Sequence, residues 1–261
     1  MLLKVKLTQE DQYIKSLKLE SEEIDSYDTF PLNLPVVKYF KELVFHPNVT
    51  YIIGENGMGK STLLEAIAIK LGFNPEGGNR NYNFSSYNSH SNLDHYLRLA
   101  KGVYKPKDGF FFRAETFYNL ATNIEELDKD PSSGPKVIDS FGGNSLHQQS
   151  HGESFFAAFT NRFQGKGLYI LDEPEAALSP VRQLSMLTII NRLVHEGSQF
   201  VISTHSPIIM AYPNAKIIQL TDEGMTESKL EETNHYAIMK QFFEDKDRLL
   251  YHLFKQDSTH F

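Results

Sequence analysis

The chain has 261 residues, 40% of them hydrophobic, which is enough to bury the core of one large domain. It has no cysteine, which excludes disulfide bonds and cysteine-held metals and suits a reducing cytoplasm. It also lacks the apolar run of roughly 18 residues that a membrane helix needs, and its formal net charge of −7 argues weakly against a broad DNA-binding face. We therefore expect a cytoplasmic protein without membrane insertion.

The N-terminal residues 1–48 are predicted to form short β segments separated by polar turns. Residues 3–7, 13–19 and 43–45 show the apolar patterns of partly buried strands. Tyr13 is a candidate for stacking on an adenine ring, although an aromatic side chain packed within a strand is the simpler interpretation.

A glycine-rich segment follows, between a predicted buried strand and a predicted helix. Residues 49–53 are β-branched, aromatic or apolar, and residues 63–71 have the pattern of a helix that ends near Gly72. Between them the sequence fits the phosphate-loop pattern of Gly, four residues, Gly-Lys and then Ser or Thr. This context favours a nucleotide site over a plain glycine turn. The residues assigned to the cofactor-binding loop are Gly54, Glu55, Asn56, Gly57, Met58, Gly59, Lys60, Ser61 and Thr62.

The chemistry of the loop follows from its residue types. Glycines let backbone N–H groups approach phosphate oxygens that a Cβ would block, and the N-terminus of the following helix also favours an anion. Lys60 is predicted to reach the β- and γ-phosphates, and the Ser61 hydroxyl is predicted to bind Mg²⁺.

The middle of the chain alternates predicted helices with one buried strand. A helix capped by Ser91 is predicted over residues 91–101, and a buried strand over 109–114 runs into a helix over 115–127. The tract Ser150-His151-Gly152-Glu153 then opens a strongly apolar helix.

Two further apolar strands end in polar residues. Residues 167–171 precede Asp172 and Glu173, and residues 199–203 precede His205. Open α/β sheets bind ligands at the carboxyl ends of their strands. Asp172 is predicted to be the second Mg²⁺ ligand, acting through water. Glu173 is predicted to accept the proton of the water that attacks the γ-phosphorus, and His205 to donate a hydrogen bond to the γ-phosphate.

The rest of the chain adds a predicted helix over residues 180–195, a strand over 216–220 and a helical tail over 231–254. No internal repeat or heptad array is apparent.

In this order the motifs resemble those of an ABC-type ATPase. The order is Gly-x4-Gly-Lys-Ser, Ser-x-Gly-Glu opening a helix, a strand ending in Leu-Asp-Glu-Pro, and Ser-Thr-His, which together span residues 54–207. The chain is most similar to the soluble branch with the structural-maintenance-of-chromosomes and recombination-repair ATPases, and to compact stand-alone bacterial ATPases labelled AAA-family. The resemblance implies an α/β P-loop NTPase core of ABC type: a mixed, largely parallel sheet flanked by helices, an N-terminal antiparallel β part, and a helical subdomain. We expect one domain over residues 1–261, with the subdomain at about 75–165.

The resemblance also implies how the site is completed, with ATP and Mg²⁺ as cofactors. Ser150, Gly152 and Glu153 match the signature loop, which in the family contacts the γ-phosphate bound by the opposite subunit. An ATP-dependent homodimer would then bury two nucleotides head to tail. A hydroxyl, a bare glycine backbone and a helix N-terminus suit a second anion cradle. Arg182 could reach across that interface or be an ordinary surface arginine.

Two departures from the family pattern leave details open. The family's glutamine loop near Mg²⁺ has no clear Gln here, and its best positional match is Glu115, a carboxylate that would alter the contacts to the metal. Only about 35 residues separate Glu115 from Ser150. Chromosome-type ATPases insert a long coiled coil there, so this chain is not a rod-forming member.

The leading interpretation is an ATPase that dimerises on ATP, separates after hydrolysis and acts as a switch on DNA or a protein partner. The alternative is the ATP-binding subunit of a membrane transporter. Against it stand Glu153, where transporters usually have Gln, and the missing glutamine loop. A third interpretation, ATP sensing without turnover, leaves no role for Glu173 as a base.

Overall fold

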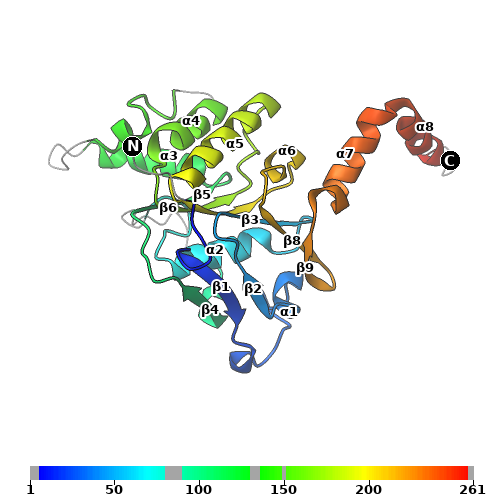
Figure 1. Cartoon of the computed structure of the whole chain (residues 1–261), viewed down its shortest axis with the longest axis horizontal. Helices are drawn as coiled ribbons and strands as arrows, with labels where there is room; N and C mark the ends of the chain where they lie inside the picture. The colour runs from blue at the N-terminus through cyan, green and yellow to red at the C-terminus, as the bar shows by residue number, and fades with distance from the viewer. Residues whose placement is uncertain (1–5, 80–89, 130–135, 149–150, 258–261) are drawn as a thin grey trace.

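A six-stranded sheet is the centre of the computed structural model, which describes residues 6–79, 90–129, 136–148 and 151–257. The spatial order is β5-β6-β7-β3-β8-β9 (Figure 1). All neighbours pair in parallel except β8 and β9, which pair antiparallel at one edge. In spatial order the strands are Asp108–Arg113, Gly167–Asp172, Gln199–Ser203, Val49–Gly54, Lys216–Thr221 and Gly224–Ser228. The central strands β3, β6 and β7 are buried at every position, as expected for apolar runs covered on both faces.

Two hydrophobic clusters hold helices against the two faces of this sheet. On one face lie α3, α4, α5 and α6, whose apolar side chains pack with Tyr51, Phe112 and Phe200. Their bounds are Phe117–Leu127, His151–Ala157, Pro180–His195 and Pro207–Met210. On the other face lie α2 (Lys60–Lys70) and the short α1 (Pro35–Lys38). The shorter turns are 3-10 helices at Ser21–Glu23, Leu93–Tyr96, Val137–Phe141 and Leu230–Glu232, and a π turn at Ala158–Arg162.

A second, antiparallel sheet packs on the α2 side in the order β2-β1-β4. Its strands are Glu42–Val44, Ile14–Leu19 and Leu97–Lys101. This arrangement confirms the expected fold class, a mixed and largely parallel sheet with an antiparallel β part. Tyr13 is buried and its hydroxyl donates to the Gly197 carbonyl at 2.8 Å, so it is a packing residue. Of the strand predicted over 3–7, residues 3–5 lie outside the described residues, and the described residues 6 and 7 are not in a strand.

The helix predicted over residues 91–101 is wrong. The structure has a 3-10 turn at Leu93–Tyr96 and then strand β4, which pairs with β1 through Leu99 and Leu17. Leu97 and Leu99 are two residues apart and therefore share a face of the strand, and pairing with β1 outweighed the local helical pattern. The amide N–H of Ser91, the predicted cap, donates instead to Glu65 at 2.9 Å.

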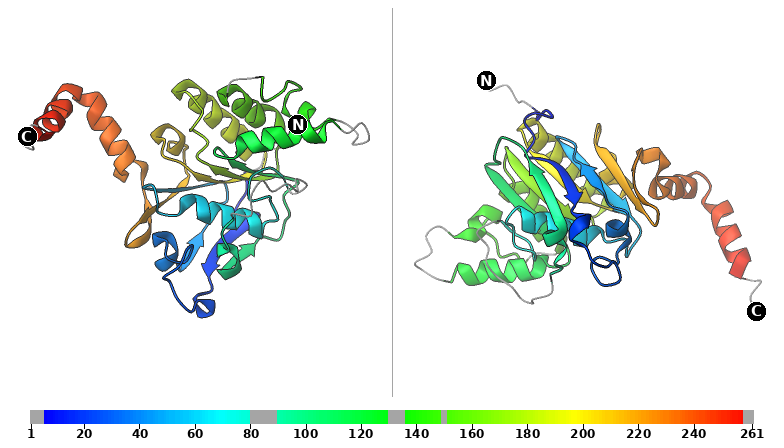
Figure 2. Two further views of the ribbon diagram at one scale, coloured as in Figure 1. Left: turned by 180° about the vertical axis from the view of Figure 1, so that it is seen from behind. Right: turned by 90° about the horizontal axis from the view of Figure 1, so that it is seen from below.

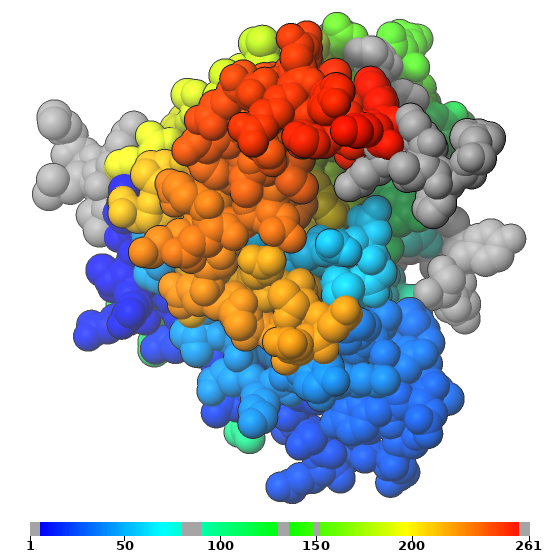
Figure 3. All heavy atoms as spheres, turned by 90° about the vertical axis from the view of Figure 1, so that its right-hand side faces the viewer, coloured from blue at the N-terminus to red at the C-terminus, as the bar shows by residue number. Residues whose placement is uncertain are grey.

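The predicted helical tail consists of two helices, α7 (Asn234–Glu244) and α8 (Lys246–Asp257), with a break at Asp245. They form an arm that projects from the body of the molecule (Figures 1 and 2), and Figure 3 views the molecule from the side on which the arm lies. The arm exposes apolar side chains, including Ile238, Phe243 and Phe254. In the part of the chain that the structure describes, no helix has both the length and the apolar character of a bilayer span.

Candidate functional site

The phosphate-loop segment lies between the end of β3 and the start of α2, as predicted. Gly54 and Gly59 have φ values of +154° and +93°, which side-chain-bearing residues rarely adopt. A Cβ on Gly59 would lie 2.6 Å from Cγ1 of Val36, and one on Gly54 would lie 2.9 Å from the Leu220 carbonyl oxygen. Glycine is therefore required at both positions by conformation and by space.

Lys60 begins α2 and is almost fully buried in the loop. Its Nζ donates to the carbonyl oxygens of Gly54 at 2.8 Å and Glu55 at 3.0 Å. Burial lowers the Lys60 pKa, while the nearby carboxylates of Glu173 and Asp172 act in the opposite direction. These contacts hold a cation within the loop that the sequence assigned to phosphate binding.

Ser61 and Asp172 meet at the site although they are far apart in the sequence. The Ser61 hydroxyl donates to Oδ1 of Asp172 at 3.2 Å, and the Ser203 hydroxyl donates to the same oxygen at 2.5 Å. Asp172 is buried, and this raises the pKa of its carboxyl even though Ser203, Arg113 and Ser61 counteract the shift. A hydroxyl and a carboxylate oxygen side by side are the hard donors that Mg²⁺ prefers.

The residues present fit a Mg²⁺ ion that is shared with nucleotide phosphates. Among the described residues, no group of three or more His, Cys, Asp or Glu side chains is placed to hold a metal. The described residues therefore do not form a metal site in which protein side chains supply every ligand. Mg²⁺ commonly takes one or two protein ligands and completes its shell with phosphates and water, which the Ser61–Asp172 pair allows.

Arg113 is a site residue that the sequence reasoning did not single out. It ends β5 directly beside Asp172, its register partner on β6. Its guanidinium contacts three carboxylates: Oε2 of Glu65 at 2.7 Å, Oε2 of Glu115 at 3.3 Å and Oδ2 of Asp172 at 3.7 Å. Its place at the carboxyl end of a buried aromatic strand was the available signal, but the contact with Glu65 spans 48 positions and leaves no periodic pattern.

Glu115, predicted as a metal ligand, points mainly to solvent. Its side chain is 79% exposed and is paired with Arg113. The structure thus connects Glu115 to Asp172 through the Arg113 guanidinium, and its role at the metal stays a prediction.

Glu173 and His205 lie together at the ends of β6 and β7. Glu173 has a φ of +49°, and its amide N–H donates to the carbonyl and hydroxyl oxygens of Ser203, each at 3.1 Å. A non-glycine residue in this region costs on the order of 1 kcal/mol or more and recurs at functional sites. Oε1 of Glu173 lies 3.5 Å from Nε2 of His205. The His205 amide N–H donates to Glu175 at 2.5 Å, so that the partly buried Glu175 carboxylate holds the loop after β7.

His235, from the first turn of α7, also reaches this group. Its Nε2 lies 3.1 Å from Nδ1 of His205. Burial lowers the pKa of both imidazoles below the ordinary value of 6.5. The sequence predicts a helical tail over this stretch and no site role for His235, because nothing local indicates a contact across 30 positions.

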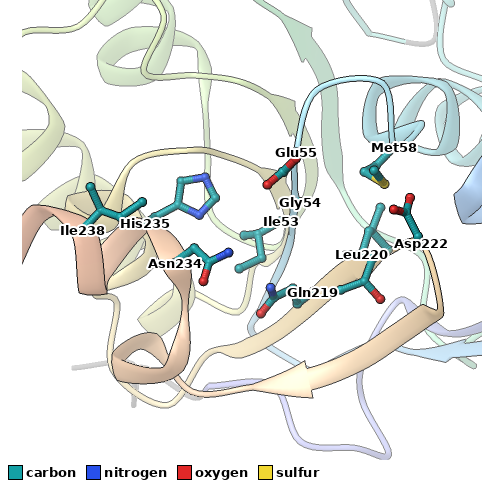
Figure 4. A pocket seen from close by; sticks show the side chains of 11 residues that line it. Ile53, Gly54, Glu55, Met58, Gln219, Leu220, Asp222, Asn234, His235 and Ile238 are labelled. Carbon is teal, nitrogen blue, oxygen red and sulfur yellow. The ribbon is translucent and has the colours of Figure 1, made fainter. Parts of the chain in front are cut away.

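Beside the loop lies a pocket of about 330 Å³ between the ends of β3 and β8 and the start of α7 (Figure 4). Figure 4 shows Asn234 and His235 on one side of the pocket and Met58 and Asp222 on the other. Glu55 of the loop lies between them. The start of the C-terminal arm therefore forms one wall beside the predicted phosphate site.

The predicted signature tract lies at the start of α4. Ser150 lies outside the described residues, whereas Gly152 and Glu153 are in the first turn of the helix. A Cβ on Gly152 would come within 2.6 Å of the Ala177 carbonyl oxygen. Glu153 lies 3.8 Å from Arg182, whose guanidinium also lies over the Phe156 ring. Arg182 thus contacts its own signature helix, and the contact of this helix with a nucleotide stays a prediction.

Parts of this chain are similar in sequence to known families and proteins. A family model described as "AAA domain" matches residues 18–120, and one described as "AAA domain, putative AbiEii toxin, Type IV TA system" matches residues 100–211. The cobalt import ATP-binding protein CbiO of Salmonella typhimurium is 27% identical over 203 residues, covering 74% of this chain and 74% of that protein. The energy-coupling factor transporter ATP-binding protein EcfA of Carboxydothermus hydrogenoformans is 28% identical over 166 residues, covering 60% of each. Among solved structures, a nucleotide-free ATP-binding cassette from an ABC transporter has a TM-score of 0.49 and 14% identity, covering 83% of this chain and 91% of that one.

A parallel strand, a glycine loop and a helix, with an aspartate at the end of a nearby strand, define a P-loop nucleotide-binding fold. The matched family models and the sequence relatives narrow the class of protein from P-loop nucleotide-binding proteins in general to ATPases. The chain is a P-loop ATPase domain of the ABC/AAA type, an enzyme that binds and hydrolyses ATP.

Proposed function

We propose that this ATPase works as a head-to-tail homodimer, with each ATP held between the phosphate loop of one copy and the signature helix of the other. The observation that carries the proposal is the placement of α4. The phosphate loop opens α2 on one face of the main sheet, whereas Gly152 and Glu153 open α4 on the opposite face (Figure 1). A second copy is the simplest source of a signature helix N-terminus over the bound γ-phosphate.

Within each site we propose that the protein residues divide the work of hydrolysis. Lys60 neutralises phosphate charge, and Ser61 with Asp172 holds Mg²⁺, which when bound would draw electrons from the phosphate oxygens. Glu173 accepts a proton from water as the water oxygen bonds to the γ-phosphorus and the bond to the ADP oxygen breaks. His205 donates its Nε2 hydrogen to the γ-phosphate and keeps it in line.

The named relatives support a membrane transporter as the partner. CbiO and EcfA are transporter ATP-binding proteins by name, and 60% or more of each aligns with this chain. This is the interpretation that the sequence analysis ranked second, and the relatives favour it over the soluble switch. We propose that the dimer docks on a membrane-embedded subunit and couples ATP hydrolysis to it.

A soluble switch is the second candidate, and one specific observation favours it. The α7–α8 arm exposes Ile238, Phe243, Tyr251 and Phe254, each more than half exposed, outside the ATPase sheet. An apolar surface on a projecting arm suits a protein partner better than it suits DNA, because the net negative charge of the chain repels the phosphate backbone.

Membrane fractionation of the source cells separates the two candidates. A tagged chain at its native level is followed in the presence of Mg²⁺-ATP, with a Lys60→Ala variant as the nucleotide-blind control. The transporter proposal predicts that the wild-type chain sediments with membranes and is released by alkaline carbonate. A chain that stays in the supernatant, with an ATPase rate raised by a soluble protein fraction or by DNA, would replace it with the switch.

A further inference from the structure

The described structure places an unassigned histidine, His235, against the histidine that the proposed mechanism uses. Nε2 of His235 lies 3.1 Å from Nδ1 of His205, which leaves Nε2 of His205 directed at Glu173, 3.5 Å away. Among the described residues, Nε2 of His205 is one of a few buried side-chain atoms without a hydrogen-bond partner. The three side chains thus form a line from α7 to the predicted catalytic base.

The direction of the hydrogen bond between the two rings follows from electrostatics. A neutral imidazole carries one N–H and one bare nitrogen, so one ring must donate and the other must accept. If His205 donated through Nδ1, its bare Nε2 lone pair would face the Glu173 carboxylate and be repelled. If His235 donates, His205 carries its hydrogen on Nε2, where it faces the carboxylate favourably. Burial lowers the pKa of both rings, which keeps them neutral at pH 7.5 and makes this choice necessary.

We propose that His235 is a positioning residue that fixes His205 in the Nε2–H form by donating its own Nε2–H to Nδ1 of His205. This inference rests on the proposed role of His205 as a donor to the γ-phosphate. In the other tautomer His205 would present a lone pair to the phosphate oxygens and repel them. His235 thereby decides which nitrogen of His205 carries the catalytic hydrogen.

The position of His235 is set by a buried cap at the base of the arm. Thr233 is fully buried, its hydroxyl donates to the Leu230 carbonyl at 2.7 Å, and it accepts the Tyr236 amide at 3.3 Å as the N-cap of α7. His235 follows in the first turn and projects toward the side of the pocket where Glu55 lies (Figure 4). A tilt of α7 would therefore move the donor away from His205, so the projecting arm is coupled to the chemistry through one hydrogen bond.

The test uses His235→Ala, His235→Gln and His205→Ala, together with the double variant His235→Ala/His205→Ala. Gln can place an amide N–H near the position of the imidazole Nε2–H and should restore the donor. His252→Ala, on the exposed surface of the same arm, is the matched control. Steady-state hydrolysis of Mg²⁺-ATP gives kcat and KM at pH 7.5, and ¹⁵N spectra of the imidazole nitrogens report the tautomer of His205.

We expect His235→Ala to lower kcat by about tenfold, the smaller end of the loss seen when an orienting outer partner is removed, with little change in KM. His235→Gln should recover most of kcat, and His235→Ala should have no further effect in the His205→Ala background. The wild-type spectrum should show Nδ1 of His205 unprotonated, and His235→Ala should add the other tautomer. An unchanged tautomer, or an equal loss of kcat in the His205→Ala background, would overturn the inference.

The same set separates this inference from the proposed function. If His205→Ala leaves kcat unchanged, the proposed role of His205 in hydrolysis fails, whatever the tautomer. If His205→Ala is slow while His235→Ala is as fast as the His252→Ala control, the role of His205 stands and that of His235 fails.

Discussion

Replacing Arg113 with methionine should lower the free energy of unfolding by about 3 kcal/mol. The Arg113 side chain is 19% exposed, and its guanidinium lies between the side chains of Glu65, 9% exposed, and Asp172, 5% exposed. Removing one partner of a buried ion pair costs about 3–5 kcal/mol, because the other charge stays buried without compensation. Glu115 adds little, since exposed pairs contribute about 0–1 kcal/mol.

The lower end of that range follows from the hydrogen bonds that would remain. Asp172 keeps the hydroxyl donors of Ser61 and Ser203, and it is 3.7 Å from the guanidinium. Glu65 keeps the Ser91 amide on Oε1 but loses its 2.7 Å contact on Oε2. Most of the loss should therefore come from Glu65, and a Glu65→Gln/Arg113→Met double variant should recover a large part of it.

Urea denaturation followed by circular dichroism measures the effect, with the slope m checked for constancy. Arg162→Met is the matched control, because Arg162 holds the similarly buried Asp108 at 3.0 and 3.1 Å at the opposite end of β5. It should destabilise the chain to a comparable extent and leave ATP affinity unchanged. A loss below about 1 kcal/mol for Arg113→Met, or the same loss in the Glu65→Gln background, would refute the reasoning.

Two further variants test the site, and a third tests the turn before β3. Glu173→Gln removes the proposed base but not the phosphate contacts, so the variant should bind ATP and accumulate as a dimer. Size-exclusion chromatography with light scattering measures this. A variant that stays monomeric at high concentration with Mg²⁺-ATP would contradict the proposed dimer with two bound nucleotides. Lys60→Ala removes the loop cation and should abolish ATP binding by calorimetry; unchanged affinity would contradict the loop assignment. Burial lowers the pKa of His46, whose bare Nδ1 accepts the Asn48 and Val49 amides at 3.2 and 3.3 Å. Its stabilising contribution should be complete above the ordinary pKa of 6.5 and be lost as the pH falls through the lowered folded-state pKa. His46→Asn keeps an acceptor that does not titrate, so its urea midpoint should fall less than that of the wild type between pH 7.5 and 5.5; equal falls would exclude His46 as the titrating group.

The parts of the site that could be predicted from sequence are those with local signals. The glycines at 54 and 59 mark backbone conformations that other residues rarely adopt, and continuous apolar runs mark the strands that carry Asp172 and His205. Since the carboxyl ends of parallel strands share one edge of a sheet, the meeting of Ser61 with Asp172 followed from the motif order.

The parts that could not be predicted depend on pairing between distant segments. Residues 97–101 have helical as well as strand spacing, and only pairing with β1 decides between them. In the sequence Arg113 is a single charged residue at the end of an aromatic strand. Its three carboxylate partners come from α2, β6 and the loop before α3, so no local pattern indicates them. His235 depends on where α7 begins, which is set by the buried Thr233 cap rather than by any periodicity.

Stability and nucleotide binding should be separable in this protein, because different charged groups carry them. Within the part of the chain that the structure describes, Lys60 Nζ donates hydrogen bonds to the carbonyl oxygens of Gly54 and Glu55 alone. Both carbonyls belong to a loop that can be hydrated once the ammonium is removed. Loss of Lys60 therefore removes a group that would bind phosphate, but it does not take a directly bonded partner away from any of the described buried carboxylates. Arg113 is the reverse case: its removal leaves Glu65 and Asp172 buried with less compensation, while the phosphate loop keeps its own cation. This division of charge requires two opposite results. A Lys60 variant should fold but not bind ATP, and an Arg113 variant should bind ATP but unfold at a lower urea concentration.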